Sequence, residues 1–466
     1  MAIKLKAAGI DDFVVLEAGA GVGGTWRDNT YPGCACDVPS HLYSFSFERR
    51  AAWSRKYSGQ AEILEYLERC ADKYRLRPHL RLNTRAEALR WDAAAGRWWV
   101  RTSEGVELSA RIVVAGVGGL RVPEIPTIPG RERFSGATFH SARWDHGYAL
   151  AGKRVAVIGT GASAIQFVPQ IADKVAQLSL FQRTPPWILP KPDRAFTGVE
   201  KRIFAAAPGI ERVYRASIYA QMEATALGFL RFPKILKAAE WLARRHIAAQ
   251  IEDPALRAAV TPSFAIGCKR ILISNDYYPA LTRPNVEVVT DPVASIEEAA
   301  VVTRSGRRVA VDAIIYGTGF AVRDFLAPMT VVGRDGQELR EAWRGGAEAF
   351  YGLAVAGFPN FFMIVGPNTG LGHNSMVVMI EAQVRYIRRC VQRILKEGLT
   401  ALEVLPARQR AFNEGLRGRM RRTVWKSGCQ SWYLDDQGEN YTLWPGYTWE
   451  FVLRTRRPRA ADFAAA

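Results

Sequence analysis

The spacing of hydrophobic residues changes from helical to extended within the first twenty positions. Residues 1–8 place apolar side chains near one helical face, and Gly9 suits the cap that ends a helix. Residues 13–17, FVVLE, form a short apolar run that ends in a carboxylate and predict a buried strand. A helix followed by a strand that ends in an acidic residue is typical of a βαβ unit that binds a dinucleotide. Glu17 would then accept hydrogen bonds from ribose hydroxyls.

The first part of that unit is missing from the pattern. A βαβ unit of this kind opens with a strand and a Gly-x-Gly-x-x-Gly turn, because only glycine lets backbone N–H groups approach a pyrophosphate. Met1 already falls inside the predicted helix, so we expect the first strand and the glycine-rich loop to be absent. A start codon assigned too late and a naturally shortened relative both explain this, and the intact residues downstream favour the first.

A second unit of the same kind is complete. Residues 111–119, RIVVAGVGG, predict a buried strand, and the Pro-rich residues 122–130 mark a boundary after it. Residues 153–172 then predict a strand, a glycine turn and a helix, and residues 178–183, LSLFQR, predict the next strand. This strand ends in Arg183 rather than in a carboxylate.

The remaining patterns predict how the two units are connected. Residues from about 196 to 256 have helical periodicity and predict a helical insertion, and residues 311–320 predict a strand that returns the chain to the first unit. A helix is expected later in that unit, from about residue 375, a serine, to residue 395. We therefore predict an α/β fold with two Rossmann-like dinucleotide-binding domains, the second inserted into the first. The predicted divisions are 1–125 for the first part of the outer domain, 126–150 for a linker, 151–318 for the inserted domain and 319–466 for the remainder.

Composition and charge narrow the class of protein. With 48% hydrophobic and 23% charged residues, the 466-residue chain has the composition of a globular protein of two or three domains. The most apolar long segment, 218–236, is interrupted by Glu223 and Arg231, so we expect no membrane span. The net charge of +18 attracts anions, and we interpret it as a solvated basic surface without a nucleic-acid partner.

The six cysteines are scattered, which fits a reducing cytoplasm better than a disulfide framework. Cys34 and Cys36 form a C-x-C pair, but no Cys or His pair at zinc-ligand spacing accompanies them. We therefore expect no metal site and a cytoplasmic location.

The glycine turn of the second unit lies between a predicted strand and a predicted helix, the context in which such a turn holds a dinucleotide. Arg183 supplies positive charge where an NAD-specific site has a carboxylate, so it can pair with the 2′-phosphate of NADP, with Lys269 as a second partner. Two dinucleotide units in one chain indicate hydride transfer from a nicotinamide to a flavin. The turn comprises Gly159, Thr160, Gly161, Ala162, Ser163 and Ala164.

The predicted linker carries the most specific motif of the chain. Residues 134–145, FSGATFHSARWD, match F-x-G-x-x-x-H-x-x-x-W-[P/D] at every fixed position: Phe134, Gly136, His140, Trp144 and Asp145. This motif resembles the fingerprint of type I Baeyer–Villiger monooxygenases, within the flavin-containing monooxygenase superfamily. The resemblance extends through VVLEAGAGVGGTW, YPGCACD, GTGASA, GCKR and GTGF, and so over nearly the whole chain. The family implies a structural role for His140 rather than proton transfer.

The resemblance implies FAD and NADPH as cofactors. The glycine turn with Arg183, Thr184 and Lys269 resembles the NADP site, and Trp432 resembles a tryptophan near the nicotinamide and the substrate. The positions that resemble flavin contacts are Glu17, Gly24, Thr25, Trp26, Asp37 and Tyr43.

Asp37 and Arg270 match the catalytic pair of the family. The implied reaction inserts one oxygen atom of O₂ into a ketone to give an ester or a lactone, and negative charge develops on the oxidant and then on its adduct. A guanidinium stays charged at any working pH, so Arg270 can stabilise that charge while Asp37 orients it.

Three alternatives remain open in the sequence. A flavin monooxygenase that oxidises nitrogen or sulfur shares this architecture, although Trp144, Asp145 and Arg270 favour ketone oxidation. A non-catalytic relative would keep one intact NADP site. A binder of nucleic acid or anionic membranes, driven by the net charge, is the weakest alternative. The aromatic-rich residues 425–447 and the helical insertion favour an apolar ketone as substrate, without setting which ketone or an oligomeric state.

Overall fold

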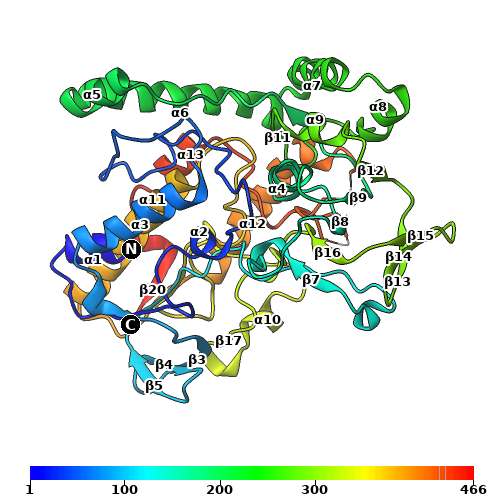
Figure 1. Cartoon of the computed structure of the whole chain (residues 1–466). Coiled ribbons are helices and arrows are strands. Elements are labelled where there is room, and N and C mark those ends of the chain that lie inside the picture. The colour runs from blue at the N-terminus through cyan, green and yellow to red at the C-terminus, as the bar shows by residue number, and fades with distance from the viewer. Residues whose placement is uncertain (430, 436) are drawn as a thin grey trace.

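The computed structural model describes residues 1–429, 431–435 and 437–466, and its architecture is α/β (Figure 1). The largest sheet has five parallel strands in the order β12-β9-β8-β16-β7. Its strands are β7 (Ala137–His140), β8 (Arg154–Ile158), β9 (Gln177–Phe181), β12 (Val286–Val289) and β16 (Ala313–Tyr316).

Both faces of this sheet are covered, so its central strands are apolar throughout. On one face, Val155 and Val157 of β8 pack with α4 (Ala164–Ile171) and α9 (Tyr277–Leu281). On the other face, Ala156 and Ile158 pack against a three-stranded antiparallel sheet. That sheet consists of β13 (Val293–Glu297), β14 (Ala300–Thr303) and β15 (Arg308–Ala310).

The fingerprint segment is an edge strand rather than a free linker. β7 pairs in parallel with β16, with Phe139 opposite Ile315 and His140 opposite Tyr316. Backbone hydrogen bonding to β16 therefore holds the motif in the five-stranded sheet, and the 3₁₀ turn Ser141–Arg143 follows directly.

The strands of the other unit form two separate parallel pairs. β1 (Val15–Leu16) pairs with β2 (Leu80–Arg81), and β6 (Val113–Ala115) pairs with β18 (Phe361–Met363). Among the described residues, no strand joins one pair to the other. α1 (Ala2–Lys6), α3 (Gln60–Lys73) and α11 (Met376–Lys396) belong to the same side of the molecule (Figure 1).

The helix and the strand expected near the N-terminus are both present. α1 ends at Lys6, and Gly9, three residues later, has a φ of 73°, the left-handed conformation that suits a helix end. The strand predicted over 13–17 is shorter than expected and covers only Val15–Leu16. The helix expected at 375–395 is present as α11, with the Ser375 hydroxyl accepting from Val377 N at its start.

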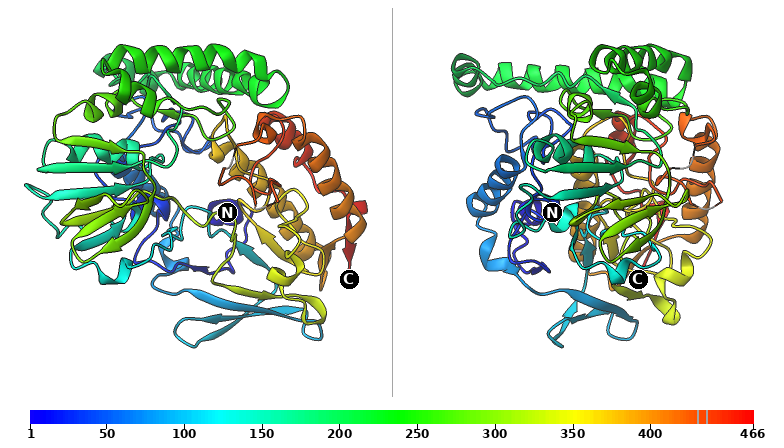
Figure 2. Two further views of the ribbon diagram at one scale, coloured as in Figure 1. Left: turned by 90° about the vertical axis from the view of Figure 1, so that its right-hand side faces the viewer. Right: turned by 45° about the vertical axis from the view of Figure 1, so that its right-hand side comes forward.

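Helices α5 to α8 form one layer across a side of the molecule (Figures 1 and 2). They are α5 (Gly198–Ala206), α6 (Pro208–Leu230), α7 (Leu236–Gln250) and α8 (Pro254–Val260), with the 3₁₀ turn η4 (Pro233–Ile235) before α7. The first and the last of these helices have capped starts, because Thr197 and Glu200 form a capping box for α5 and the Asp253 carboxylate caps α8.

Two buried carboxylates hold the inner side of α6. Glu211 pairs with His41 Nδ1 at 3.2 Å and with Arg49 Nε at 3.0 Å. Glu223 accepts hydrogen bonds from Asn374 Nδ2 and Thr448 N, both at 2.6 Å. The longest helix of the insertion is therefore fixed to the unit that contains α11.

The remaining elements complete the fold. One four-stranded sheet has the order β17-β3-β4-β5, and two strand pairs are β10·β11 and β19·β20. Their strands are β3 (Ala86–Asp92), β4 (Arg97–Thr102), β5 (Glu107–Ala110), β10 (Ile188–Leu189), β11 (Leu272–Ile273), β17 (Thr330–Val332), β19 (Leu402–Val404) and β20 (Phe463–Ala465). The other helices are α2 (Thr25–Asp28), α10 (Leu339–Ala342), α12 (Pro406–Met420) and α13 (Thr448–Arg454). In the described part of the chain, every helix is too short or too polar to span a membrane.

Candidate active site

Asp37 and Arg270 form an ion pair across the two units. A terminal guanidinium nitrogen of Arg270 donates to a carboxylate oxygen of Asp37. The side chains keep 39% and 27% of their exposure, so one side of the pair is open. The nearby Asp37 carboxylate raises the pKa of Arg270 above its ordinary value, which keeps the guanidinium charged. A fixed positive charge beside an open space can stabilise an anion that forms there.

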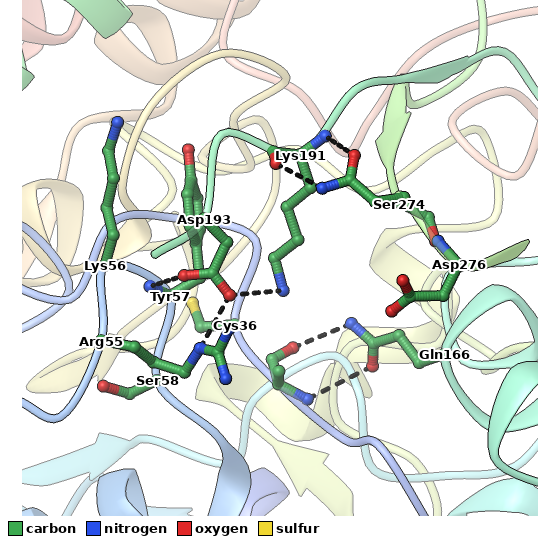
Figure 3. Close-up of polar contacts among 12 residues, drawn as sticks. Cys36, Arg55, Lys56, Tyr57, Ser58, Gln166, Lys191, Asp193, Ser274 and Asp276 are labelled. Carbon is green, nitrogen blue, oxygen red and sulfur yellow. Dashed lines mark hydrogen bonds and ion pairs between the residues drawn. The ribbon is translucent and has the colours of Figure 1, made fainter. Parts of the chain in front are cut away.

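Gln166 of α4 holds the segment that carries Asp37 (Figure 3). Its carboxamide donates to Ala35 O at 3.0 Å and accepts from Ala35 N at 3.3 Å, as a neighbouring strand would. The Tyr31 hydroxyl donates to the same amide oxygen at 3.0 Å. α4 begins at the glycine turn, so one helix links that turn to the position of Asp37.

Asp193 forms a second polar cluster, with residues of the segment that follows Asp37 (Figure 3). Its carboxylate accepts from Arg55 Nε at 2.8 Å and from Tyr57 N at 3.2 Å, and the Lys191 ammonium lies 3.8 Å away. Burial, together with the charges of Asp193 and Asp37, raises the pKa of Tyr57 to about 12. These contacts attach the loop after β10 to the chain that follows Asp37.

Arg270 lies between a strand and a disulfide. Leu272 N donates to Trp187 O at 2.9 Å as β11 joins β10. On the other side, Cys268 is bonded to Cys429, which is 161 positions away. The expectation that the cysteines form no disulfide is wrong for this pair, because folding brings together two segments that are distant in sequence. Cys34, Cys36, Cys70 and Cys390 are unpaired.

The disulfide attaches the segment that contains Trp432 and Tyr433 to the segment of Arg270. Trp432 is 46% exposed, and its ring centre is 4.2 Å from that of Tyr433. Tyr433 is buried, and this burial raises its pKa to about 12 while Arg270 opposes the shift. The Tyr433 phenol is therefore an electrostatic neighbour of the Asp37–Arg270 pair, a role that the sequence did not suggest.

A cavity of about 290 Å³ includes Tyr433 in its lining. Its other lining residues come mainly from the segment after β16 and from the C-terminal stretch. The apolar and aromatic ones are Phe325, Leu326, Met329, Trp343, Tyr433 and Tyr441, and the charged ones include Arg323, Asp324, Glu338, Arg340, Arg344 and Asp435. Tyr433 is therefore shared between this partly apolar, partly charged cavity and the surroundings of the Asp37–Arg270 pair.

The glycine turn after β8 is closely packed. Gly159 has a φ of 104°, and a Cβ there would lie 2.6 Å from Gly317 O, so only glycine fits. Ser163 is the N-cap residue of α4, and the Thr160 hydroxyl donates to Thr184 O at 3.1 Å. The turn is thus held between the ends of β8, β9 and β16.

Arg183 and Lys269 gather positive charge next to this turn. Burial, and then the charge of Arg183, lower the pKa of Lys269. Among the described residues, no carboxylate forms an ion pair with either side chain within 4.0 Å. Two cations without an acidic partner suit a phosphate ligand.

The residues that resemble flavin contacts lie around a loop that has free space beside it. Glu17 accepts from Gly19 N at 2.7 Å and pairs with Arg27 Nη1 at 3.0 Å. Trp26 Nε1 donates to the Tyr43 hydroxyl at 3.1 Å, and Thr25 begins α2. A Cβ built at Gly24 would meet nothing within 4 Å, so there is free space beside this loop.

The fingerprint residues are packing residues in this structure. His140 is buried, its Nδ1 accepts from Ala142 N at 3.1 Å, and burial lowers its pKa to about 4. Trp144 packs on Phe139 and Phe167, with ring centres 5.2 and 5.3 Å apart. A neutral, enclosed imidazole supports a structural role for His140.

Two further fingerprint residues, Gly136 and Asp145, also have structural contacts. A Cβ at Gly136 would lie 2.4 Å from Asp312 O and would also collide with the Phe134 ring. Asp145 is exposed and accepts from Gly147 N at 2.9 Å. The motif therefore fixes the end of β7 through close packing and local hydrogen bonds.

Sequence reasoning missed Gln166 and the pairing of Cys268 with Cys429. A signal for the cysteines was present, since Cys268 directly precedes Lys269 and Arg270, and Cys429 stands three residues before Trp432. Gln166 gave no such signal, because its role depends on a contact with Ala35 that is formed only in the folded chain.

Known proteins resemble the chain over almost its whole length. Residues 1–196 match the family described as pyridine nucleotide-disulphide oxidoreductase. A Baeyer-Villiger monooxygenase of Pseudomonas aeruginosa is 50% identical over 465 residues, covering 99% of this chain and 88% of the relative. One of Streptomyces coelicolor is also 50% identical, over 464 residues, covering 99% of this chain and 89% of the relative.

Solved structures agree with these relatives. An oxidized steroid monooxygenase bound to NADP has a TM-score of 0.89 at 31% identity, and a closed cyclohexanone monooxygenase has a TM-score of 0.90 at 28% identity. Each comparison covers 100% of this chain and 96% of the solved chain.

Proposed function

The chain belongs to the Baeyer–Villiger monooxygenases, and from this we propose that it uses FAD, NADPH and O₂ to convert apolar ketones into esters or lactones. The observation that carries the proposal is the Asp37–Arg270 pair, which is open on one side and lies next to Tyr433. The apolar and aromatic part of the cavity lined by Tyr433 supports an apolar substrate.

Arg270 would stabilise negative charge on the oxidant and then on the ketone adduct. When bound, the reduced flavin supplies the activated oxygen that enters the substrate. The Arg270 guanidinium keeps its charge, and the Asp37 carboxylate holds it in one orientation. Gln166 would act as a positioning residue, because it fixes the Ala35 backbone two residues before Asp37.

NADPH would bind at the glycine turn that ends β8. Gly159 lets the backbone approach the pyrophosphate, and Arg183 with Lys269 supplies the charge that a 2′-phosphate needs. Glu17, Gly24, Thr25, Trp26 and Tyr43 are the proposed flavin contacts, and Trp432 the aromatic residue near the nicotinamide.

We also propose the division into an FAD domain with an inserted NADP domain. The supporting observation is that one unbroken parallel sheet contains strands from 137–316, whereas β6 pairs with β18 and β3 pairs with β17, which joins strands from before that stretch to strands from after it. The proposed parts remain 1–125, 126–150, 151–318 and 319–466.

We propose that full flavin binding requires a further strand and a glycine-rich turn beside β1 and β6. Two observations support this: among the described residues β1 and β6 each have one strand partner, and the space beside Gly24 is open. Each buried unpaired backbone group costs about 1–3 kcal/mol, which one inserted strand would recover.

The flavin requirement is tested by fusing a strand and a Gly-x-Gly-x-x-Gly turn to the N-terminus of this chain. We expect flavin absorbance to rise from well below one FAD per chain to one, with a higher melting temperature. One FAD per chain in the unextended protein would contradict the requirement.

The oxygenation is tested with purified protein, added FAD and NADPH, and two substrates of similar size, an apolar ketone and a thioether. An ester or lactone as the main product supports ketone oxidation, with some sulfoxide expected. Sulfoxide alone would instead support a sulfur-oxidising flavin monooxygenase. NADPH binding without NADPH oxidation, even in the extended chain, would indicate a non-catalytic relative.

A further inference from the structure

The outward side of α6 lacks charge over most of its length, although it faces solvent. After Arg212, the charged residues of this helix are Arg215 and Glu223, and both are turned toward the protein. Arg215 donates to Ser44 Oγ at 3.2 Å, while Glu223 is buried against Asn374 and Thr448. A surface helix normally has the opposite pattern, with apolar residues inside and charges outside.

Large hydrophobic side chains are exposed along α5, α6 and α7 and the turn between α6 and α7. Nine of the eighteen such side chains among the described residues fall between Val199 and Leu242, so the exposure is concentrated rather than scattered. Val213 is 71% exposed, Trp241 60% and Ile235 53%. The layer occupies one side of the molecule in both views of Figure 2, and its outer surface is therefore accessible to a partner.

Basic residues lie among these apolar ones. Residues 231–245, RFPKILKAAEWLARR, contain five basic residues and one acidic residue, Glu240, which pairs with Arg244 at 2.9 Å. In the described part of the chain, Arg231, Lys234 and Lys237 have no carboxylate within 4.0 Å, and all three are exposed. The segment therefore combines accessible positive charge with Phe232, Ile235, Trp241 and Leu242.

We propose that the outer side of the α5–α8 layer binds the surface of an anionic lipid bilayer. Lysine and arginine beside exposed tryptophan, phenylalanine and leucine are what an interfacial helix uses, because the cations meet lipid phosphates while the apolar side chains enter the headgroup boundary. α6 is about 34 Å long at 1.5 Å per residue, so it would lie along the membrane plane. This inference is independent of the proposed oxygenation.

Charge favours a bilayer over a second copy of the chain. A twofold contact through the same surface would place the unpaired cations near Lys234 against the identical cations of the other copy. A nucleic acid would satisfy the cations but leave Val213, Ile235 and Leu242 without apolar partners. A bilayer with anionic headgroups satisfies both features at once.

The test is co-sedimentation of the full chain with vesicles of phosphatidylcholine alone and of phosphatidylcholine mixed with phosphatidylglycerol. We expect binding to the mixed vesicles, weakening with added salt. The double variant Lys234→Glu/Lys237→Glu should bind at least tenfold more weakly, since each unit of charge at an anionic surface contributes roughly fivefold. Phe232→Ser/Trp241→Ser should also weaken binding severalfold.

Control variants reverse the same number of charges, or remove one exposed tryptophan, elsewhere on the surface. Arg97→Glu/Arg101→Glu reverses two exposed charges on β4, and Trp449→Ser removes an exposed tryptophan on α13. Both should bind vesicles nearly as well as the unaltered chain, and melting temperatures should show that all variants are folded.

Two results would overturn the proposal. Equal weakening by the β4 control and the Lys234/Lys237 variant would mean that net charge alone attracts the vesicles. A chain that ignores both vesicle types, and whose self-association on a sizing column is lost in Phe232→Ser/Trp241→Ser, would identify the surface as a contact between copies.

Discussion

The two nucleotide-binding units differ in how completely their sheets are built. The unit around β8 has five continuous parallel strands, with β8, β9 and β16 almost wholly buried. The other unit has two parallel pairs whose strands are two or three residues long. Continuous pairing makes the first unit a rigid frame, whereas the second depends on contacts with its surroundings. Asp37 belongs to the unit with the short strand pairs. Gln166 of the five-stranded unit holds the Ala35 backbone two residues before it.

The largest expected effect comes from removing the charge that joins the two units. Arg270→Ala should lower the rate of ketone oxidation by about 100- to 1,000-fold, because one donor to a developing anion is worth that much. Product formation should fall far more than NADPH binding does. Arg270→Lys, which keeps a charge without the planar guanidinium, should recover only part of the rate. An Arg270→Ala enzyme with unchanged product formation would remove this residue from the reaction.

Matched glycine substitutions compare the two units directly. Gly159→Ala should lower the free energy of unfolding by about 2–4 kcal/mol, because the new Cβ would meet Gly317 O at 2.6 Å in a left-handed backbone. Gly24→Ala should cost less than Gly159→Ala, about 1–3 kcal/mol, since its backbone (φ 50°, ψ −116°) strains an L residue but its surroundings are open. Denaturant titration measures both, and equal losses would contradict the assigned difference in packing.

The cation pair should distinguish the cofactors. Arg183→Ala and Lys269→Ala should each weaken NADPH binding by roughly 10-fold, with little effect on NADH, because charged hydrogen bonds to the 2′-phosphate are lost. Isothermal titration with each dinucleotide checks this. Arg154→Ala, an exposed arginine at the start of the same sheet, is a suitable control. Equal losses for NADPH and NADH would argue for a general effect on folding.

Acid should destabilise the five-stranded unit, because His140 takes up a proton more readily in the unfolded chain than in the folded one. Its folded pKa of about 4 is below the ordinary 6.5, so the unfolded chain takes up a proton first as the pH falls. Stability is therefore fully present above about pH 6.5 and is lost as the pH falls from there toward 4. His140→Asn keeps an acceptor for Ala142 N, and it should reduce the loss between pH 7 and pH 5 by about 1–2 kcal/mol.

Melting curves at the two pH values test this assignment. His146→Asn, at an exposed position, is the control and should leave the pH dependence of stability unchanged. If the two variants behave alike, then His140 does not account for the sensitivity to acid.

The smallest effect concerns the disulfide beside Arg270. Thiol titration of the unfolded chain should count four thiols without reductant and six with it, since Cys268 and Cys429 are bonded. Cys429→Ser should raise the share of NADPH consumed without product severalfold at most, because Trp432 is held less firmly. Cys390→Ser, at a buried unpaired cysteine, should not change that share. Six thiols without reductant would contradict the bond.

Local patterns predicted the elements best where a strand is buried on both faces or a helix has a clear start. β8, β16 and α11 fall where the apolar runs and Ser375 indicate. The strand at β1 is shorter than predicted, since an apolar run does not reveal whether a partner strand is available. The fingerprint was expected in a linker, but pairing with β16, which is distant in sequence, makes it an edge strand.

The site was predicted only as far as motifs specify residue types. Asp37 and Arg270 were expected together and form an ion pair. The partners that hold them were not expected, because Gln166, Cys429 and Tyr433 act through contacts between segments more than a hundred residues apart. Sequence spacing contains no information on which surfaces of two folded units will meet.

Asp37 and Arg270 come from different units, and this limits how such enzymes can be recombined. A chimera that takes its NADP unit from another protein would also import a foreign counterpart of Gln166, and with it a new distance between guanidinium and carboxylate. Crossover points should therefore keep residues 31–37, α4 and the segment of Cys268 to Arg270 from a single parent. Swapping the four-stranded β17-β3-β4-β5 sheet should be tolerated far better, because within the described part of the chain the side-chain contacts that hold this pair come from other elements.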